Sequence, residues 1–185
     1  MQNFKKTESP EKLVFVSKIE TVPGGGTVAV KDLGGDRVYA GAPLHKDSNG
    51  LYHVIKVAKV AENAGSTATS IKIAKGSNLK AGDYLGVAGT SAKQISAIDR
   101  DGSTSYDTVT LAATLGALTA GDLLEGVQSS NAGYSVDGYL GETFDILKGD
   151  NHLQSIVVRG TITESVLAMP VTSRIKSATP LVRFV

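Results

Sequence analysis

The sequence predicts a mostly β fold: a compact β-barrel or sandwich-like body with a duplicated strand-turn-strand element and one short C-terminal helix. Three observations lead to this fold class. Short runs rich in β-branched residues recur along the chain, separated by Gly, Asp and Asn, which is typical of short strands joined by turns. One strand-turn-strand phrase occurs twice. Helical periodicity is scarce and is clearest in one segment near the C-terminus.

The duplicated phrase reads Leu-x-Ala-Gly-Asp-x-Leu and begins at Leu79 and again at Leu118. Glycine supplies unusual backbone angles at little steric cost, and aspartate can hydrogen-bond its own local backbone. We therefore expect Asp83 and Asp122 to stabilise equivalent turns. Two copies are too few for a solenoid, so the phrase predicts a duplicated element inside one compact domain. The leucines expected to be buried are Leu79, Leu85, Leu118 and Leu124.

The other strands are delimited by turn residues. Asn49-Gly50 is the strongest kind of short hairpin signal, and residues 99–102 read as a second hairpin-type turn. Glycines at residues 24–26 and 34–35 interrupt the N-terminal part of the chain. The strands expected in chain order span residues 13–22, 27–30, 37–44, 51–60, 69–74, 94–98, 108–112, 155–163 and 181–185.

The helix is expected over residues 170–178. Proline suits a first helical turn, and Val171, Ile175 and Ala178 recur on one helical face. Pro180 ends the segment, and the apolar residues 181–185 follow it. That tail is a strand of its own subunit in one interpretation and a contact with a neighbouring subunit in the other.

Composition excludes several classes of function. Lys and Arg number 19 and Asp and Glu 18, a net charge of +1, so no strongly basic field attracts nucleic acid or an anionic membrane. Cysteine is absent, which excludes disulfides, thiolate catalysis and Cys-based zinc sites. The sequence has no apolar run of the roughly 20 residues that a membrane helix needs. Its start carries no stretch typical of a signal peptide, and we expect a protein made in the cytoplasm.

Histidine and aromatic residues offer no recognisable binding motif. The histidines are His45, His53 and His152, and none has the spacing that a metal site needs. We expect His53 at a surface or strand edge and the other two in solvent. Tryptophan is absent and aromatic residues make up 5% of the chain, whereas sugar and single-stranded nucleic-acid sites usually stack their ligands on aromatic rings.

Carboxylate pairs are the remaining candidates for chemistry. Asp99 with Asp101, and Glu142 with Asp145, have the residue types of an acid and base pair, but we expect solvated turn residues. Residues 99–102 resemble the start of a calcium loop without its later ligands. Calcium binding shared by the aspartates of the duplicated phrase is an alternative that no other ligand supports. The glycine loop at residues 23–27 precedes a β-rich run and lacks the lysine of a phosphate loop. We expect no catalytic residue, no cofactor and no bound metal.

Two stretches of the chain resemble a known family. Val38-Tyr39-Ala40-Gly41-Ala42-Pro43-Leu44 resembles the opening phrase of phage and prophage head decoration and head-fibre proteins. Ile156-Val157-Val158-Arg159-Gly160-Thr161-Ile162-Thr163-Glu164, with the proline, short helix and apolar end that follow, resembles their closing pattern. The likeness to a lambda-like capsid decoration pattern covers residues 37–60 and 154–185. The middle is similar to segments inserted between these phrases in longer prophage members.

The resemblance implies a non-enzymatic virion protein on the capsid surface. It implies the major capsid protein as partner, a homotrimer, and an N-terminal arm that engages the shell, with no nucleic acid and no membrane. The parts expected are a flexible arm of residues 1–11, a decoration-like β body of residues 12–65 and 128–185, and a β-rich insert of residues 66–127. A bacterial surface or adhesion β module is the alternative. An enzyme with a dispersed carboxylate site is the third possibility.

Overall fold

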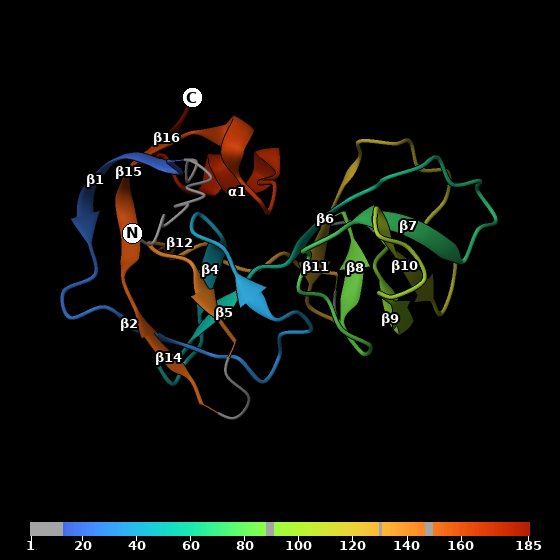
Figure 1. Cartoon of the computed structure of the whole chain (residues 1–185), viewed down its shortest axis with the longest axis horizontal. Helices are drawn as coiled ribbons and strands as arrows, with labels where there is room; N and C mark the ends of the chain where they lie inside the picture. The colour runs from blue at the N-terminus through green and yellow to red at the C-terminus, as the bar shows by residue number, and fades with distance from the viewer. Residues whose placement is uncertain (1–12, 88–90, 130, 147–149) are drawn as a thin grey trace, which may run out of the picture.

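The computed structural model describes residues 13–87, 91–129, 131–146 and 150–185. These residues form two lobes, each with its own hydrophobic core (Figure 1). The larger lobe contains both ends of the described chain, and the smaller lobe is built from its middle. The expectation of a mostly β fold with a short C-terminal helix is confirmed.

An eight-stranded sheet forms the larger lobe, in the order β1-β15-β12-β4-β5-β2-β14 with β16 also beside β15. Because β14 runs into β15 through Ser155, the last strand of this path continues into its second strand, and the sheet curls into a half-barrel. Its strands are β1 (Phe15–Thr21), β2 (Gly26–Val28), β4 (Pro43–Lys46), β5 (Tyr52–Val54), β12 (Gly138–Leu140), β14 (His152–Gln154), β15 (Ile156–Ile162) and β16 (Val182–Phe184).

Short elements complete the larger lobe. The strand pair β3 (Arg37–Val38) and β13 (Phe144–Asp145) lies beside the main sheet, and a 3-10 turn, η1, covers Glu164–Val166. The helix α1 (Ser173–Ala178) begins three residues later than expected, because Thr172 is its N-cap: the Thr172 hydroxyl accepts a hydrogen bond from the Ile175 amide. Ile175 points into the core, as the periodicity predicts.

The smaller lobe is a six-stranded sheet in the order β6-β11-β8-β9-β10-β7. A bridge between Val60 and Ile73 joins β6 to β7, so the sheet closes into a small barrel. Its strands are β6 (Val57–Lys59), β7 (Ser70–Ala74), β8 (Tyr84–Gly86), β9 (Lys93–Asp99), β10 (Tyr106–Leu111) and β11 (Leu123–Val127). The strand expected over residues 51–60 is therefore wrong: the chain crosses between the lobes after β5, and the two halves of that run join different sheets.

The duplicated phrase makes two turns with the same hydrogen bonds. Asp83 Oδ2 accepts from the Lys80 amide at 2.8 Å, and Asp122 Oδ2 accepts from the Thr119 amide at 2.7 Å. The glycine before each aspartate has a φ of +95° or +100°, which a side chain would strain. Each turn leads into the strand that follows it, β8 or β11, and these two strands pair with each other. The expectation of a duplicated element is confirmed.

Burial of the phrase leucines follows the prediction for three of four positions. Leu79, Leu85 and Leu124 are buried in the core of the smaller lobe, whereas Leu118 is only partly buried against it. Leu118 pairs with Ala64 outside the named strands, at the border of the barrel, so less of the barrel wall covers it.

We predict that Leu85→Ala or Leu124→Ala lowers the free energy of unfolding by roughly 2–5 kcal/mol, because each removes buried methyl groups and leaves a cavity. Denaturant titration measures this loss. Leu153→Ala is the matched control, since Leu153 is 70% exposed and should change stability by at most about 0.5 kcal/mol. Equal losses in all three variants would contradict the assignment of the core.

Candidate functional site

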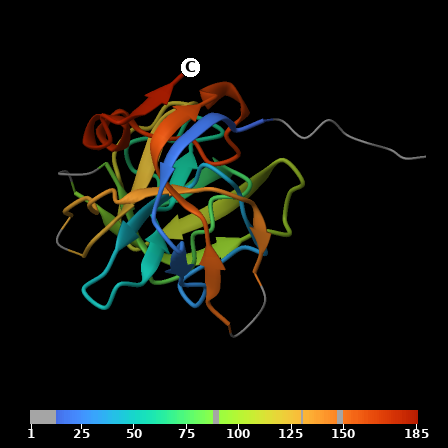
Figure 2. The same ribbon diagram turned by 90° about the vertical axis from the view of Figure 1, so that its left-hand side faces the viewer.

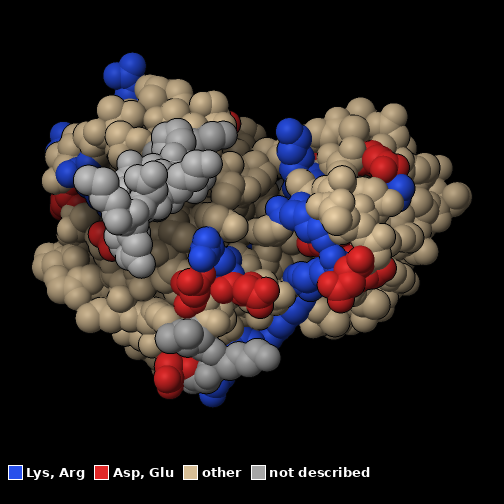
Figure 3. Space-filling view, viewed as in Figure 1, with Lys and Arg blue, Asp and Glu red and all other residues tan. Residues whose placement is uncertain are grey.

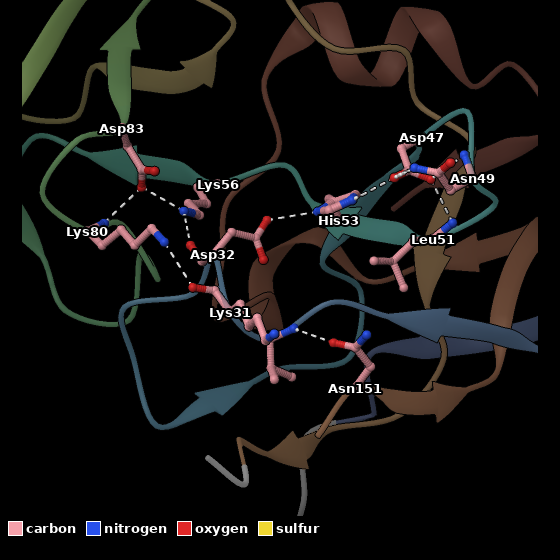
Figure 4. A network of polar contacts seen from close by, with 11 residues as sticks. Lys31, Asp32, Asp47, Asn49, Leu51, His53, Lys56, Lys80, Asp83 and Asn151 are labelled. Carbon is pink, nitrogen blue, oxygen red and sulfur yellow. Dashed lines mark hydrogen bonds and ion pairs between the residues drawn. The ribbon is translucent and has the colours of Figure 1, made fainter. Parts of the chain in front are cut away.

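The junction between the lobes holds a network of charged and polar side chains (Figure 4). The chain crosses from the larger to the smaller lobe at Lys56, whose side chain is only 8% exposed. Its ammonium lies 2.6 Å from Asp83 Oδ2, in the first duplicated turn, and donates to the carbonyl oxygen of Asp32 in the larger lobe. One buried cation therefore binds both lobes at once.

A loop of the larger lobe runs along the smaller lobe beside this pair. Lys80 Nζ donates to the Lys31 carbonyl at 2.9 Å, and the Gly34 amide donates to the Asn78 carbonyl at 3.0 Å. A Cβ atom at Gly34 would clash with the Leu79 carbonyl oxygen. The glycines at 34 and 35, expected only to end a strand, thus permit close approach of the two lobes.

A second polar contact joins the lobes through α1. The carboxylate of Glu125, in β11, is buried and accepts from Arg174 Nε at 2.9 Å and Nη2 at 2.7 Å. The Thr172 hydroxyl donates to the other oxygen of Glu125. Arg174 Nη1 also donates to the Tyr134 carbonyl at 3.0 Å. Because both ends of this ion pair have further partners, the desolvated charges are satisfied.

Two histidines extend the junction network toward solvent. His53 Nδ1 lies 3.0 Å from Asp32 Oδ2, and His53 Nε2 lies 3.6 Å from Asp47 Oδ2. The ring of His45 stacks between His53, at 5.1 Å, and Tyr134, at 4.2 Å. Burial lowers the pKa of His45, and the neighbouring His53 lowers it further. A cavity of about 190 Å³, lined by His45, Tyr134 and the buried ion pair, lies beside these rings.

A larger cavity of about 640 Å³ opens at one end of the larger lobe. Its walls are apolar around Phe15 and carry two cations. Lys18 Nζ donates to the Gly141 carbonyl at 2.8 Å, and Arg37 Nε lies 2.5 Å from Asp145 Oδ1. Both cations are thus already held by the protein's own oxygen atoms.

Charged groups of both signs alternate along the junction on the face shown in Figure 3. Among the described residues, no three His, Asp or Glu side chains are arranged to hold a metal ion. In the same part of the chain, no helix is long and apolar enough to cross a membrane. The paired charges at the junction hold the lobes to each other.

The structure corrects the expectation for two histidines. His45 is half-buried in the ring stack and is not solvated. His152 stacks on Phe144 at 4.7 Å and is also partly buried. His53, expected at a surface or strand edge, lies in β5, which pairs with β4 on one side and β2 on the other, and is partly buried. His45 and His53 come together because β4 and β5 pair with these residues directly opposite.

The carboxylate candidates do not form one site. Asp99 accepts hydrogen bonds from the amides of Asp101 and Gly102, both at 3.0 Å, in the turn after β9. Asp145 is held in the ion pair at the larger cavity, and Glu142 is exposed beside that cavity. The first pair lies in the smaller lobe and the second in the larger.

Sequence reasoning missed Lys56 and Glu125. Each is a lone charge inside an apolar run, Val54-Ile55-Lys56-Val57-Ala58 and Leu123-Leu124-Glu125-Gly126-Val127. Such a charge indicates a buried, paired group when the run itself is buried. The pattern could therefore have identified both residues, although not their partners.

No family model, no curated protein and no solved structure matches the chain.

We predict that Lys56→Met destabilises the protein by about 3–5 kcal/mol, because it leaves the Asp83 carboxylate without its cation at the junction. Asp83→Asn keeps an acceptor for the Lys80 amide and removes the charge. The double variant should therefore lose less than the sum of the two single losses. Chemical denaturation measures all three, and Lys59→Met, at an exposed position of β6, is the control. Additive losses would show that the pair does not interact.

We predict that stability falls as the pH drops below 6.5, in part through His45. Its pKa is lowered from 6.5 in the folded protein, so the unfolded chain takes up the proton first and acid favours unfolding. Stability from this group is complete above pH 6.5 and is lost below it. His45→Phe keeps a stacking ring without a titrating group and should flatten that part of the profile. An identical pH dependence in both proteins would refute the assignment.

Proposed function

We propose that this chain is a structural protein of a phage or prophage virion and binds the outer capsid surface as a decoration or head-fibre component. One observation carries the proposal. The two stretches that resemble the family, residues 37–60 and 154–185, contribute β4, β5, β15 and β16 to the same sheet of the larger lobe. Apart from β6, all strands of the smaller lobe lie between these stretches in the sequence. The two stretches that carry the resemblance therefore meet in one sheet of the larger lobe.

The rest of the chain suits a role in assembly. The lobes are tied together by the Lys56 and Glu125 contacts, on different strands and loops, so the protein can present fixed surfaces to a partner. Exposed large apolar side chains gather on the strands at the two ends of the described chain. In this proposal the partner is the major capsid protein and the chain associates as a homotrimer, in keeping with the closed symmetry of most homo-oligomers.

Residues 1–11 are the part that we propose contacts the shell. They lie outside the described residues, and the argument for them comes from sequence alone. The segment carries Lys5, Lys6, Glu8 and Glu11, with too little apolar surface to fold without a partner.

Binding to capsids tests the proposed function directly. Purified chain is mixed with capsids assembled from the major capsid protein of the same genome and sedimented through a density gradient. We expect the chain to move with the capsids and an antibody against it to label the outside of intact heads. Capsids from an unrelated phage are the control. Chain that stays at the top of the gradient overturns the proposal, and antibody labelling of the host cell envelope would favour the adhesion alternative.

We predict that removing residues 1–11 abolishes capsid binding and leaves the melting temperature nearly unchanged. The truncated chain keeps every strand and both hydrophobic cores, which begin at residue 13 or later. Calorimetry measures the melting temperature, and the same gradient measures binding. Truncated chain that still decorates capsids at full occupancy contradicts the role given to this segment.

A further inference from the structure

Exposed apolar side chains are concentrated on two strands of the larger lobe. Among the described residues, seven large hydrophobic side chains are exposed, and five of them belong to β1, to β16 or to residues within two positions of these strands. The five are Leu13, Val16, Ile19, Leu181 and Val185. Figure 2 shows β1 in blue and β16 in red at the same end of the larger lobe, and β15 pairs with both. Such a concentration on a protein surface marks an interaction site.

Each of these strands has a free edge. Within the described residues β1 pairs only with β15, and β16 pairs only with β15. At Gly160, for example, Lys18 of β1 is the partner on one side and Val182 of β16 is the partner on the other. The tail strand thus belongs to its own subunit, and the backbone groups on its outer edge, like those of β1, are open to a further strand.

Bulges in β1 direct apolar side chains outward. Phe15 and Ser17 face consecutive residues of β15, which makes Val16 an extra residue, and Ile19 is the extra residue between Lys18 and Glu20. Val16 and Ile19 are 59% and 63% exposed. A bulge re-aims a side chain, and here the two re-aimed side chains are apolar.

The lysine of β1, Lys18, does not protect the free edge of this strand. Lysine on an edge strand discourages pairing with another chain. Lys18 of β1, however, donates to the Gly141 carbonyl at 2.8 Å, and its ammonium lies 5.2 Å from the centre of the Phe15 ring. The Lys18 ammonium is thus already bound by groups of its own subunit.

The two edges carry opposite charges. Glu20 of β1 and Arg183 of β16 are both exposed, and within the described chain neither has an ion-pair partner. A second β1 edge offers Glu20 another acidic side chain and a lysine that is already bound, whereas the β16 edge offers it the exposed Arg183. Charge complementarity therefore favours a second copy that approaches with its other edge.

We propose that this chain associates with itself head to tail, with the β1 edge of one copy packed against the β16 edge of the next. The apolar side chains of the two edges are buried against each other, and Glu20 of one copy pairs with Arg183 of its neighbour. Such a contact uses two different surfaces, so it forms a closed ring when the rotation between copies permits. The inference rests on the homotrimer of the proposed function and names its contact surfaces, and it is tested in solution without a capsid.

Light scattering across a dilution series measures the association of the purified chain. Ile19→Lys and Leu181→Lys each place a charge in the apolar contact, and each should raise the concentration needed for association at least about tenfold. Leu153→Lys is the matched control at an equally exposed leucine of β14 and should associate like the unaltered chain. Melting temperatures confirm that each variant folds, and Val16→Lys replaces any variant that does not.

Charge reversal tests the pairing of the edges. Glu20→Arg and Arg183→Glu should each weaken association, and the double variant should restore it. Because the chain has no cysteine, Ile19→Cys and Leu181→Cys proteins can also be mixed and oxidised with diamide. We expect crosslinks between the two different variants in excess over those within either one, and none with Leu153→Cys.

Three results overturn the proposal. They are an unaltered chain that stays monomeric at every concentration, variants of the two edges that associate normally, and a double charge reversal that fails to recover. A monomeric chain whose edge variants lose capsid binding would assign this face to the shell. Loss of capsid binding with self-association intact would instead count against the proposed function alone.

Discussion

The Lys56 ammonium lies where the chain passes from the larger lobe to the smaller lobe, and the arrangement of the two lobes depends on it. A buried cation is costly unless oxygen atoms surround it. Here one oxygen belongs to a loop of the larger lobe, at Asp32, and the other to a turn of the smaller lobe, at Asp83. Only when both lobes are in place is the charge satisfied.

This constraint explains why two equivalent turns have different roles. The aspartates of both copies accept a hydrogen bond from the amide three residues earlier. The Asp122 side chain is exposed and makes no further hydrogen bond or ion pair among the described contacts. The Asp83 side chain is mostly buried and also binds Lys56. The internal symmetry of the smaller barrel is thus broken at the junction, where Lys56 binds the aspartate of the first copy and not that of the second.

The attraction within a buried ion pair is largely offset by the desolvation of its charges, whereas the loss of one partner leaves the other charge uncompensated. Together with the Glu125–Arg174 pair, the Lys56–Asp83 pair selects one orientation of two bodies that each have their own core. The glycines at 34 and 35 also favour this orientation, since side chains there would hold the lobes apart. The result is a protein whose outer surfaces, including the edges of β1 and β16, keep a fixed relation. Recognition through the strand edges requires that the edges keep fixed positions, because strand pairing depends on the position and direction of both strands.

The sequence by itself determined the local features: the β fold class, the two Asp-stabilised turns and the short C-terminal helix. These features depend on neighbouring residues, and the conformational preferences and spacing of such residues can be read directly from the sequence. The tertiary structure alone decided where the run of residues 51–60 breaks, which partners the buried charges bind, and that His45 stacks with His53 and Tyr134. It also decided the bulges at Val16 and Ile19, because a bulge exists only relative to the register of its partner, β15. The candidate surfaces arise from such long-range pairings, and no spacing within one segment encodes them.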